Sequence, residues 1–170
     1  PTLYPQYCAG STQSPINIDT KLTSLSDEPV FTYFQFNEIP NKATLKNDGN
    51  TAEIRFEYNS ALPPLVTNGG LPGVYKVAQI HYHWGPDSVS GSDHQVNSIS
   101  YPLEMHLVTQ NAKYKDLAEA VDKSDGIAVL GFFFKASLSP DIGPGARKVY
   151  DALDQIKDTG TTIDLSFSLN

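Results

Sequence analysis

The histidines of this chain are confined to one short stretch of strand-like sequence. All four lie between residues 79 and 110 of 170. His81 and His83 are two residues apart, so on a β-strand they project from the same face, about 7 Å apart along the backbone. A second strand-like run at 103–108 contains His106. If the two runs are neighbouring strands, a third imidazole approaches the first two, and the stretch then predicts one site carried on two strands.

Three neutral imidazoles are a ligand set typical of catalytic zinc. Zn²⁺ accepts ring nitrogens at about 2.0–2.1 Å, and a tetrahedral ion with three protein ligands keeps a fourth position for water. Gln79 and Glu104 each lie two residues before a histidine, where a polar side chain can hold the other ring nitrogen of a ligand. The spacing alone leaves open an ordinary pair of polar histidines. A structural zinc site is disfavoured, because such sites have four protein ligands, with cysteine among them.

Length and composition predict one globular domain. With 170 residues, 39% of them hydrophobic, the chain can bury roughly 70% of its unfolded surface. A net charge of -7 argues against nucleic acid or an anionic membrane as partner, since both attract basic patches. No run approaches 18 apolar residues, and no basic segment followed by an apolar core opens the chain. We therefore expect neither a membrane span nor an intact signal peptide.

The remaining pattern is mostly of the β type. Residues 30–58 are rich in aromatic and alternating apolar residues, with the clearest turn at 47–50. The almost wholly apolar run 127–136 predicts a strand that is buried on both faces. Further expected elements are a Pro- and Gly-rich loop at 62–73, a strand at 74–84, and helices at 114–123 and 146–157.

Several motifs resemble those of the α-class carbonic anhydrases. They are Gln-Ile-His-Tyr-His-Trp-Gly at 79–85, Gly-Ser-Asp-His at 91–94, Leu-Glu-Met-His-Leu-Val at 103–108, and flanking runs at 13–18 and 126–133. The matches occur in the family's order and run nearly end to end. The resemblance implies an α+β, mainly β fold, with a large, twisted, mostly antiparallel central sheet and a few short peripheral helices. It also implies a single domain over 1–170 that lacks the family's C-terminal strands.

The resemblance implies a role for each residue of the site. It assigns His81, His83 and His106 as Zn²⁺ ligands, Gln79 and Glu104 as their hydrogen-bond partners, Asp93 as an orienting carboxylate, His94 as a structural histidine, Asn50 as the residue at the proton-shuttle position, and Val108, Val129 and Trp84 as the substrate pocket. The family has glutamate at the position of Asp93, so the carboxylate here is one methylene shorter.

The implied activity is the reversible hydration of carbon dioxide to bicarbonate and a proton, by attack of zinc-bound hydroxide. Fast members of the family have a histidine at the position of Asn50, because an imidazole can carry protons at neutral pH. Asparagine does not titrate, so we expect slow to moderate turnover. The alternative is a carbonic-anhydrase-like binding or matrix domain with little or no catalysis. The three intact ligands favour the enzyme.

Two expectations concern residues outside the sequence as given. In the family a further segment follows, with a Thr-Thr-Pro-Pro-like motif and more strands. We expect that segment as further residues or as a second chain. Cys8 is the single cysteine, and the resemblance implies that it is disulfide-linked to that segment, which would place the protein in a secreted or extracellular setting.

Overall fold

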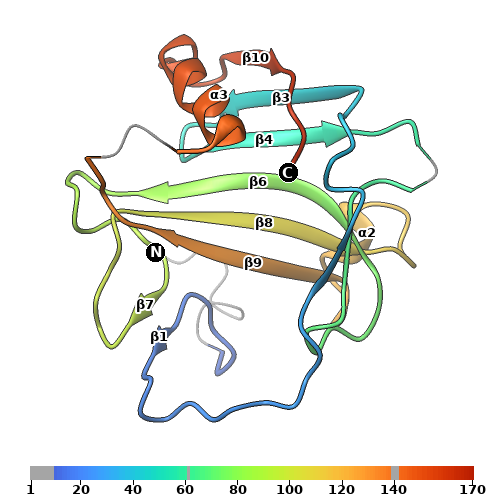
Figure 1. Cartoon of the computed structure of the whole chain (residues 1–170), viewed down its shortest axis with the longest axis vertical. Coiled ribbons are helices and arrows are strands. Elements are labelled where there is room, and N and C mark those ends of the chain that lie inside the picture. Colours follow the sequence, from blue (N-terminus) through green and yellow to red (C-terminus); the bar gives the residue numbers. More distant parts are fainter. Residues whose placement is uncertain (1–9, 61, 139–141) are drawn as a thin grey trace. The chain divides into compact units, whose positions relative to one another are not determined.

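The fold is mainly β, as a computed structural model of residues 10–60, 62–138 and 142–170 shows (Figure 1). The main sheet contains β2 (Thr32–Phe34), β3 (Lys42–Asn47), β4 (Ala52–Glu57), β5 (Leu65–Thr67), β6 (Tyr75–Trp84), β8 (Leu103–Asn111), β9 (Ile127–Phe134) and β10 (Thr162–Leu165). Its order is β10-β3-β4-β6-β5-β2, with β8 paired to β6 and β9 paired to β8. The pairs β10–β3, β3–β4, β4–β6, β5–β6 and β2–β5 are antiparallel, which confirms the expected fold class.

Short elements accompany the sheet. β1 (Asn17–Ile18) and β7 (Gln95–Val96) form a separate parallel pair. The helices are α2 (Leu117–Ala120), α3 (Pro144–Ala152) and the 3₁₀ helix η1 (Leu153–Ile156). The helix predicted at 114–123 is shorter than expected. It begins only after Asp116, which caps its N-terminus by accepting a hydrogen bond from the Glu119 amide. None of the helices in the described residues is long and apolar enough to cross a membrane.

The chain divides into two compact units. Unit 1 comprises Pro1–Leu25, His83–Glu104 and Phe133–Ala136, and unit 2 comprises Ser26–Tyr82, Met105–Phe132 and Ser137–Asn170. Three strands, β6, β8 and β9, each contribute residues to both units. A single domain over 1–170 stays a prediction.

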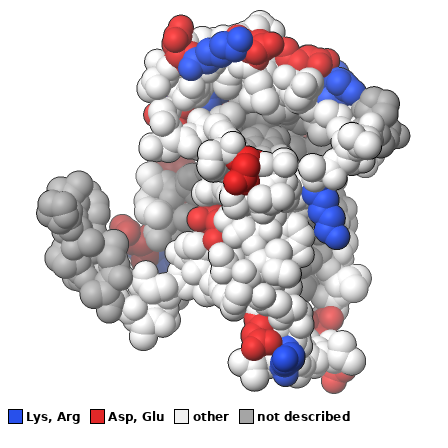
Figure 2. Space-filling model, turned by 90° about the vertical axis from the view of Figure 1, so that its left-hand side faces the viewer, with Lys and Arg blue, Asp and Glu red and all other residues white. Residues whose placement is uncertain are grey.

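Strict alternation gives β3 and β4 one apolar and one polar face. Ala43, Leu45 and Ile54 are fully buried, and they belong to the same core cluster as Val149 of α3 and Ile156 of η1. The residues between them on the strands are polar or charged and partly exposed. Successive side chains of a strand point to opposite faces, so the charges share the face away from the helices. Figure 2 shows charges of both signs gathered at the end where β10 and α3 lie in Figure 1.

The turn between β3 and β4 has the conformation that its sequence predicts. Gly49 has a φ of 98°, a region that glycine enters without steric cost. The Asp48 carboxylate accepts hydrogen bonds from the amides of Asn50 (2.8 Å) and Thr51 (2.9 Å). These two bonds hold the pKa of Asp48 below its usual value. The turn sets the register in which β4 follows β3.

The prediction for 127–136 is right about the strand and wrong about its burial. Leu130 of β9 is buried, but Val129 is 50% exposed and Phe132 is 39% exposed. Among the described residues, β9 pairs with β8 alone, and Val129 and Phe132 project from opposite faces of the strand, so apolar side chains are exposed on both faces. An apolar run predicts the strand from local preference, whereas burial depends on what packs against it.

The loop prediction for 62–73 is also wrong in part, because β5 lies within it. Val66 is fully buried, and β5 pairs antiparallel with both β2 and β6. Pro64 precedes the strand, and Asn68, with a φ of 63°, follows it. Turn-forming residues on both sides of β5 predict a loop, whereas this three-residue strand is stabilised by pairing with its two neighbouring strands.

Candidate metal site

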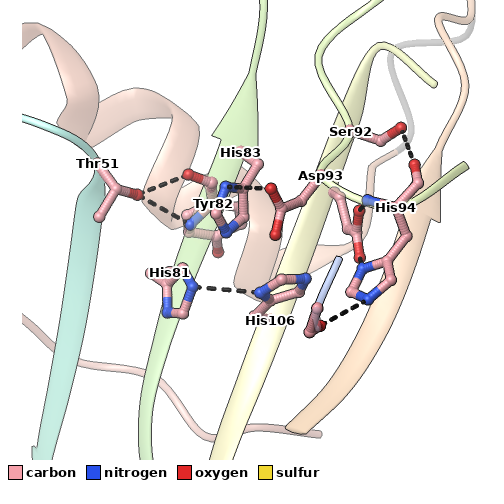
Figure 3. A network of polar contacts seen from close by, with 10 residues as sticks. Thr51, His81, Tyr82, His83, Ser92, Asp93, His94 and His106 are labelled. Carbon is pink, nitrogen blue, oxygen red and sulfur yellow. Dashed lines mark hydrogen bonds and ion pairs between the residues drawn. The ribbon is translucent and has the colours of Figure 1, made fainter. Parts of the chain in front are cut away.

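His81 and His106 face each other from the neighbouring strands β6 and β8 (Figure 3). His81 Nε2 lies 3.2 Å from His106 Nδ1, and His106 is buried. The other nitrogen of His81, Nδ1, is 2.9 Å from the Gln79 carbonyl oxygen Oε1. An amide oxygen can only accept, so Nδ1 donates and Nε2 keeps its lone pair. Two nitrogens bound to one tetrahedral zinc are about 3.3 Å apart, so this pair fits the ion.

His83 lies two residues beyond His81 on β6, and the two therefore project from one face of the strand. Its Nδ1 lies 4.0 Å from the carboxylate oxygen Oδ1 of Asp93, and each side chain is about one-third exposed. His81, His83 and His106 together form a group of ring nitrogens that could hold a metal ion. The residues present therefore fit Zn²⁺, as the sequence predicts.

Glu104 holds His94 in place. The carboxyl group is 1% exposed, and its two oxygens contact the His94 amide and the His94 ring nitrogen Nδ1, both at 2.8 Å. The Ser14 hydroxyl lies 3.2 Å from the second ring nitrogen, Nε2. Ser92 donates to the His94 carbonyl at 2.6 Å. Both ring nitrogens of His94 thus have protein partners, an arrangement in keeping with a structural histidine. The role of Glu104 as hydrogen-bond partner of a zinc ligand stays a prediction, and its contact to His94 is one that residue spacing does not indicate.

Thr51 fastens the segment that carries the histidine pair, and nothing in the sequence pattern pointed to it. The backbone pairing of β4 with β6 ends at Glu53 opposite His81. Beyond that point, the Thr51 hydroxyl donates to the Tyr82 carbonyl at 2.6 Å and accepts from the Tyr82 amide at 3.0 Å (Figure 3). The Thr51 side chain thereby takes the place of the next pair of backbone hydrogen bonds between β4 and β6, at Tyr82, which lies between His81 and His83.

An ion pair lies on β4 beside the first histidine. The Arg55 guanidinium donates two hydrogen bonds to the Glu53 carboxylate, at 2.6 and 3.3 Å. The Glu53 side chain is 12% exposed and that of Arg55 is 69% exposed. Hydrogen bonding to Glu53 raises the pKa of Arg55 further above its usual value. The Arg55 guanidinium therefore stays charged at neutral pH.

The remaining predicted residues differ in their surroundings. Val108 on β8 is buried, whereas Val129 on β9 and Trp84 at the end of β6 are about half exposed. Asn50 lies in the turn after β3, with its amide held by Asp48. The pocket assigned to Val108, Val129 and Trp84 and the assignment of Asn50 to the shuttle position stay predictions. Cys8 lies outside the described residues, so its pairing also stays a prediction.

Comparison with known proteins agrees with the site. The model of the eukaryotic-type carbonic anhydrase family matches residues 2–170. Carbonic anhydrase 3 of Rattus norvegicus is 36% identical over 159 residues. That alignment covers 93% of this chain and 58% of the relative, so the chain spans little more than half of the relative's length. With a family match over nearly all of its residues and three histidines grouped on its sheet, the chain belongs to the eukaryotic-type carbonic anhydrases.

Proposed function

We propose that this chain carries the zinc site of a carbonic anhydrase and supports the reversible hydration of carbon dioxide to bicarbonate and a proton. The observation that carries the proposal is the pair of ring nitrogens on His81 and His106, 3.2 Å apart, with His83 on the same strand face as His81. A zinc ion bound there would supply a nucleophile from water near neutral pH. Family membership supports the reaction class.

The chain's own residues prepare this chemistry. Gln79 keeps the proton of His81 on Nδ1 and so directs the lone pair of Nε2 toward His106. Asp93, beside His83, is the proposed orienting carboxylate. The proposed apolar pocket, formed by Val108, Val129 and Trp84, would receive the neutral substrate. Asn50 has no titratable group, so we propose that protons leave mainly to buffer and that turnover is slow to moderate.

We also propose that further residues of the protein cover exposed apolar side chains on β9. The exposure of Val129 and Phe132 supports this, as does the greater length of the curated relative.

A disulfide through Cys8 and a secreted location remain part of this proposal. The measurement is the intact mass of the native protein, reduced and non-reduced. A mass that drops on reduction supports the link, and an unchanged mass contradicts it.

The proposed function is tested by measuring zinc content and carbon dioxide hydration on the same protein. We expect one zinc per purified protein and carbon dioxide hydration above the uncatalysed rate in stopped flow, with both lost on chelation and regained with added zinc. His81→Ala and His106→Ala should abolish zinc uptake. His94→Gln is the matched histidine control and should retain zinc. Zinc uptake unaffected by either ligand variant would refute the site, and bound zinc without hydration would favour the binding or matrix domain.

A further inference from the structure

The charged face of β4 meets the metal-site strand in a defined register. Glu53 lies directly opposite His81 on β6, and Arg55 lies directly opposite Gln79. Directly opposed residues of antiparallel strands share a face, with their Cβ atoms about 4.5–5.5 Å apart. The Glu53 side chain therefore starts beside that of the first proposed ligand, and the Arg55 side chain starts beside that of the ligand's hydrogen-bond partner.

The charges of Glu53 and Arg55 differ in how strongly solvent screens them. The Glu53 side chain is 12% exposed and that of Arg55 is 69% exposed, so water screens the cation more strongly than the anion. Lys46 lies opposite Glu53 on the far side, on β3, but it is exposed. The less screened charge of the pair is therefore the carboxylate, and Arg55 neutralises it through two hydrogen bonds.

We propose that the Glu53–Arg55 pair is a specificity-determining element that sets how strongly the metal site retains small anions. The inference rests on the proposed zinc function. Carbon dioxide is neutral, so a neighbouring carboxylate does not oppose its approach. Bicarbonate and inhibitory anions carry the charge that Glu53 repels. The pair thereby favours release of the anionic product, and Arg55 limits the repulsion to a moderate level.

The inference predicts opposite effects for the two partners. Glu53→Gln removes the carboxylate and frees the Arg55 charge, so anions should bind about three- to tenfold more tightly. Arg55→Gln leaves Glu53 without its neutralising partner, so anions should bind more weakly by a similar factor. Arg55→Lys retains the charge and should stay near wild type. A purely structural role of the pair would move both variants in the same direction.

Glu57 provides a matched control on the same strand. It shares the face of Glu53 on β4, is exposed, and lies opposite Lys42. Four residues of strand separate the two glutamates by about 13 Å, which exceeds the Debye length of about 10 Å at 0.1 M salt. Glu57→Gln changes the net charge as Glu53→Gln does, and it should leave anion affinity unchanged.

The experiment is an azide titration of the cobalt-loaded protein, followed by visible absorption at fixed neutral pH and about 0.1 M ionic strength. Metal content is measured first for every variant. Opposite shifts for Glu53→Gln and Arg55→Gln that shrink in high salt, with Glu57→Gln unchanged, support the inference. Equal azide affinities, or shifts of one sign, in fully loaded proteins overturn it and leave the proposed function standing. A wild-type protein that takes up no metal overturns both.

Discussion

Thr51→Val tests whether a single hydroxyl holds the histidine-bearing strand in place. Valine keeps the branched shape and the strand preference of threonine but removes both hydrogen bonds to Tyr82, at 2.6 and 3.0 Å. Each bond contributes about 0.5–1.5 kcal/mol, and the partly buried Tyr82 amide and carbonyl lose their partner. We expect a loss of about 2 kcal/mol in unfolding free energy, which lowers Tm by about 4–8 °C in a chain of this size.

The same substitution should weaken zinc binding by about tenfold, because Tyr82 lies between His81 and His83 and its backbone positions both. Denaturant unfolding and zinc titration by calorimetry measure the two effects. Thr51→Ser retains the hydroxyl and should restore both. Thr162→Val, at an exposed position of β10, is the control for the chemical change and should cost less than about 0.5 kcal/mol. A Thr51→Val protein with unchanged stability and zinc affinity would refute the reasoning.

Three further substitutions test individual features of the fold. Tyr58→Phe should stabilise by about 1 kcal/mol, because the Tyr58 hydroxyl is buried and has no hydrogen-bond partner in the described residues. Burial raises the pKa of Tyr58 to about 12 from 10.0 in the unfolded chain, so the wild type should lose stability between about pH 10 and 12. In urea melts over that range, Tyr58→Phe should lose less stability than the wild type. Tyr150→Phe, at an exposed site, should match the wild type. Gln35→Gly should raise Tm, because Gln35 has a φ of 58°, a backbone conformation that costs a residue other than glycine about 1 kcal/mol. An unchanged or lower Tm would contradict this. Gly91→Ala should destabilise strongly in the same assay, because a Cβ there would lie 2.5 Å from the Pro102 carbonyl oxygen.

Local chemistry is enough to predict part of the site. His81 and His83 share a face because side chains alternate along any strand, and Gln79 joins them for the same reason. The turn at 47–50 follows from the preferences of asparagine, aspartate and glycine, which act within a few residues. These features need no information about the rest of the chain, so local residue preferences are enough to predict them.

Contacts between distant residues depend on strand order and register, which periodicity does not specify. His106 meets His81 across 25 positions of sequence because β8 pairs with β6. Glu53 stands opposite His81, and the Thr51 hydroxyl reaches Tyr82, only in the register that β4 adopts against β6. The burial of Glu104 against His94 and the exposure of β9 likewise depend on which surfaces come together. The ligand types and their spacing follow from local sequence, whereas the groups that surround them depend on long-range strand pairing.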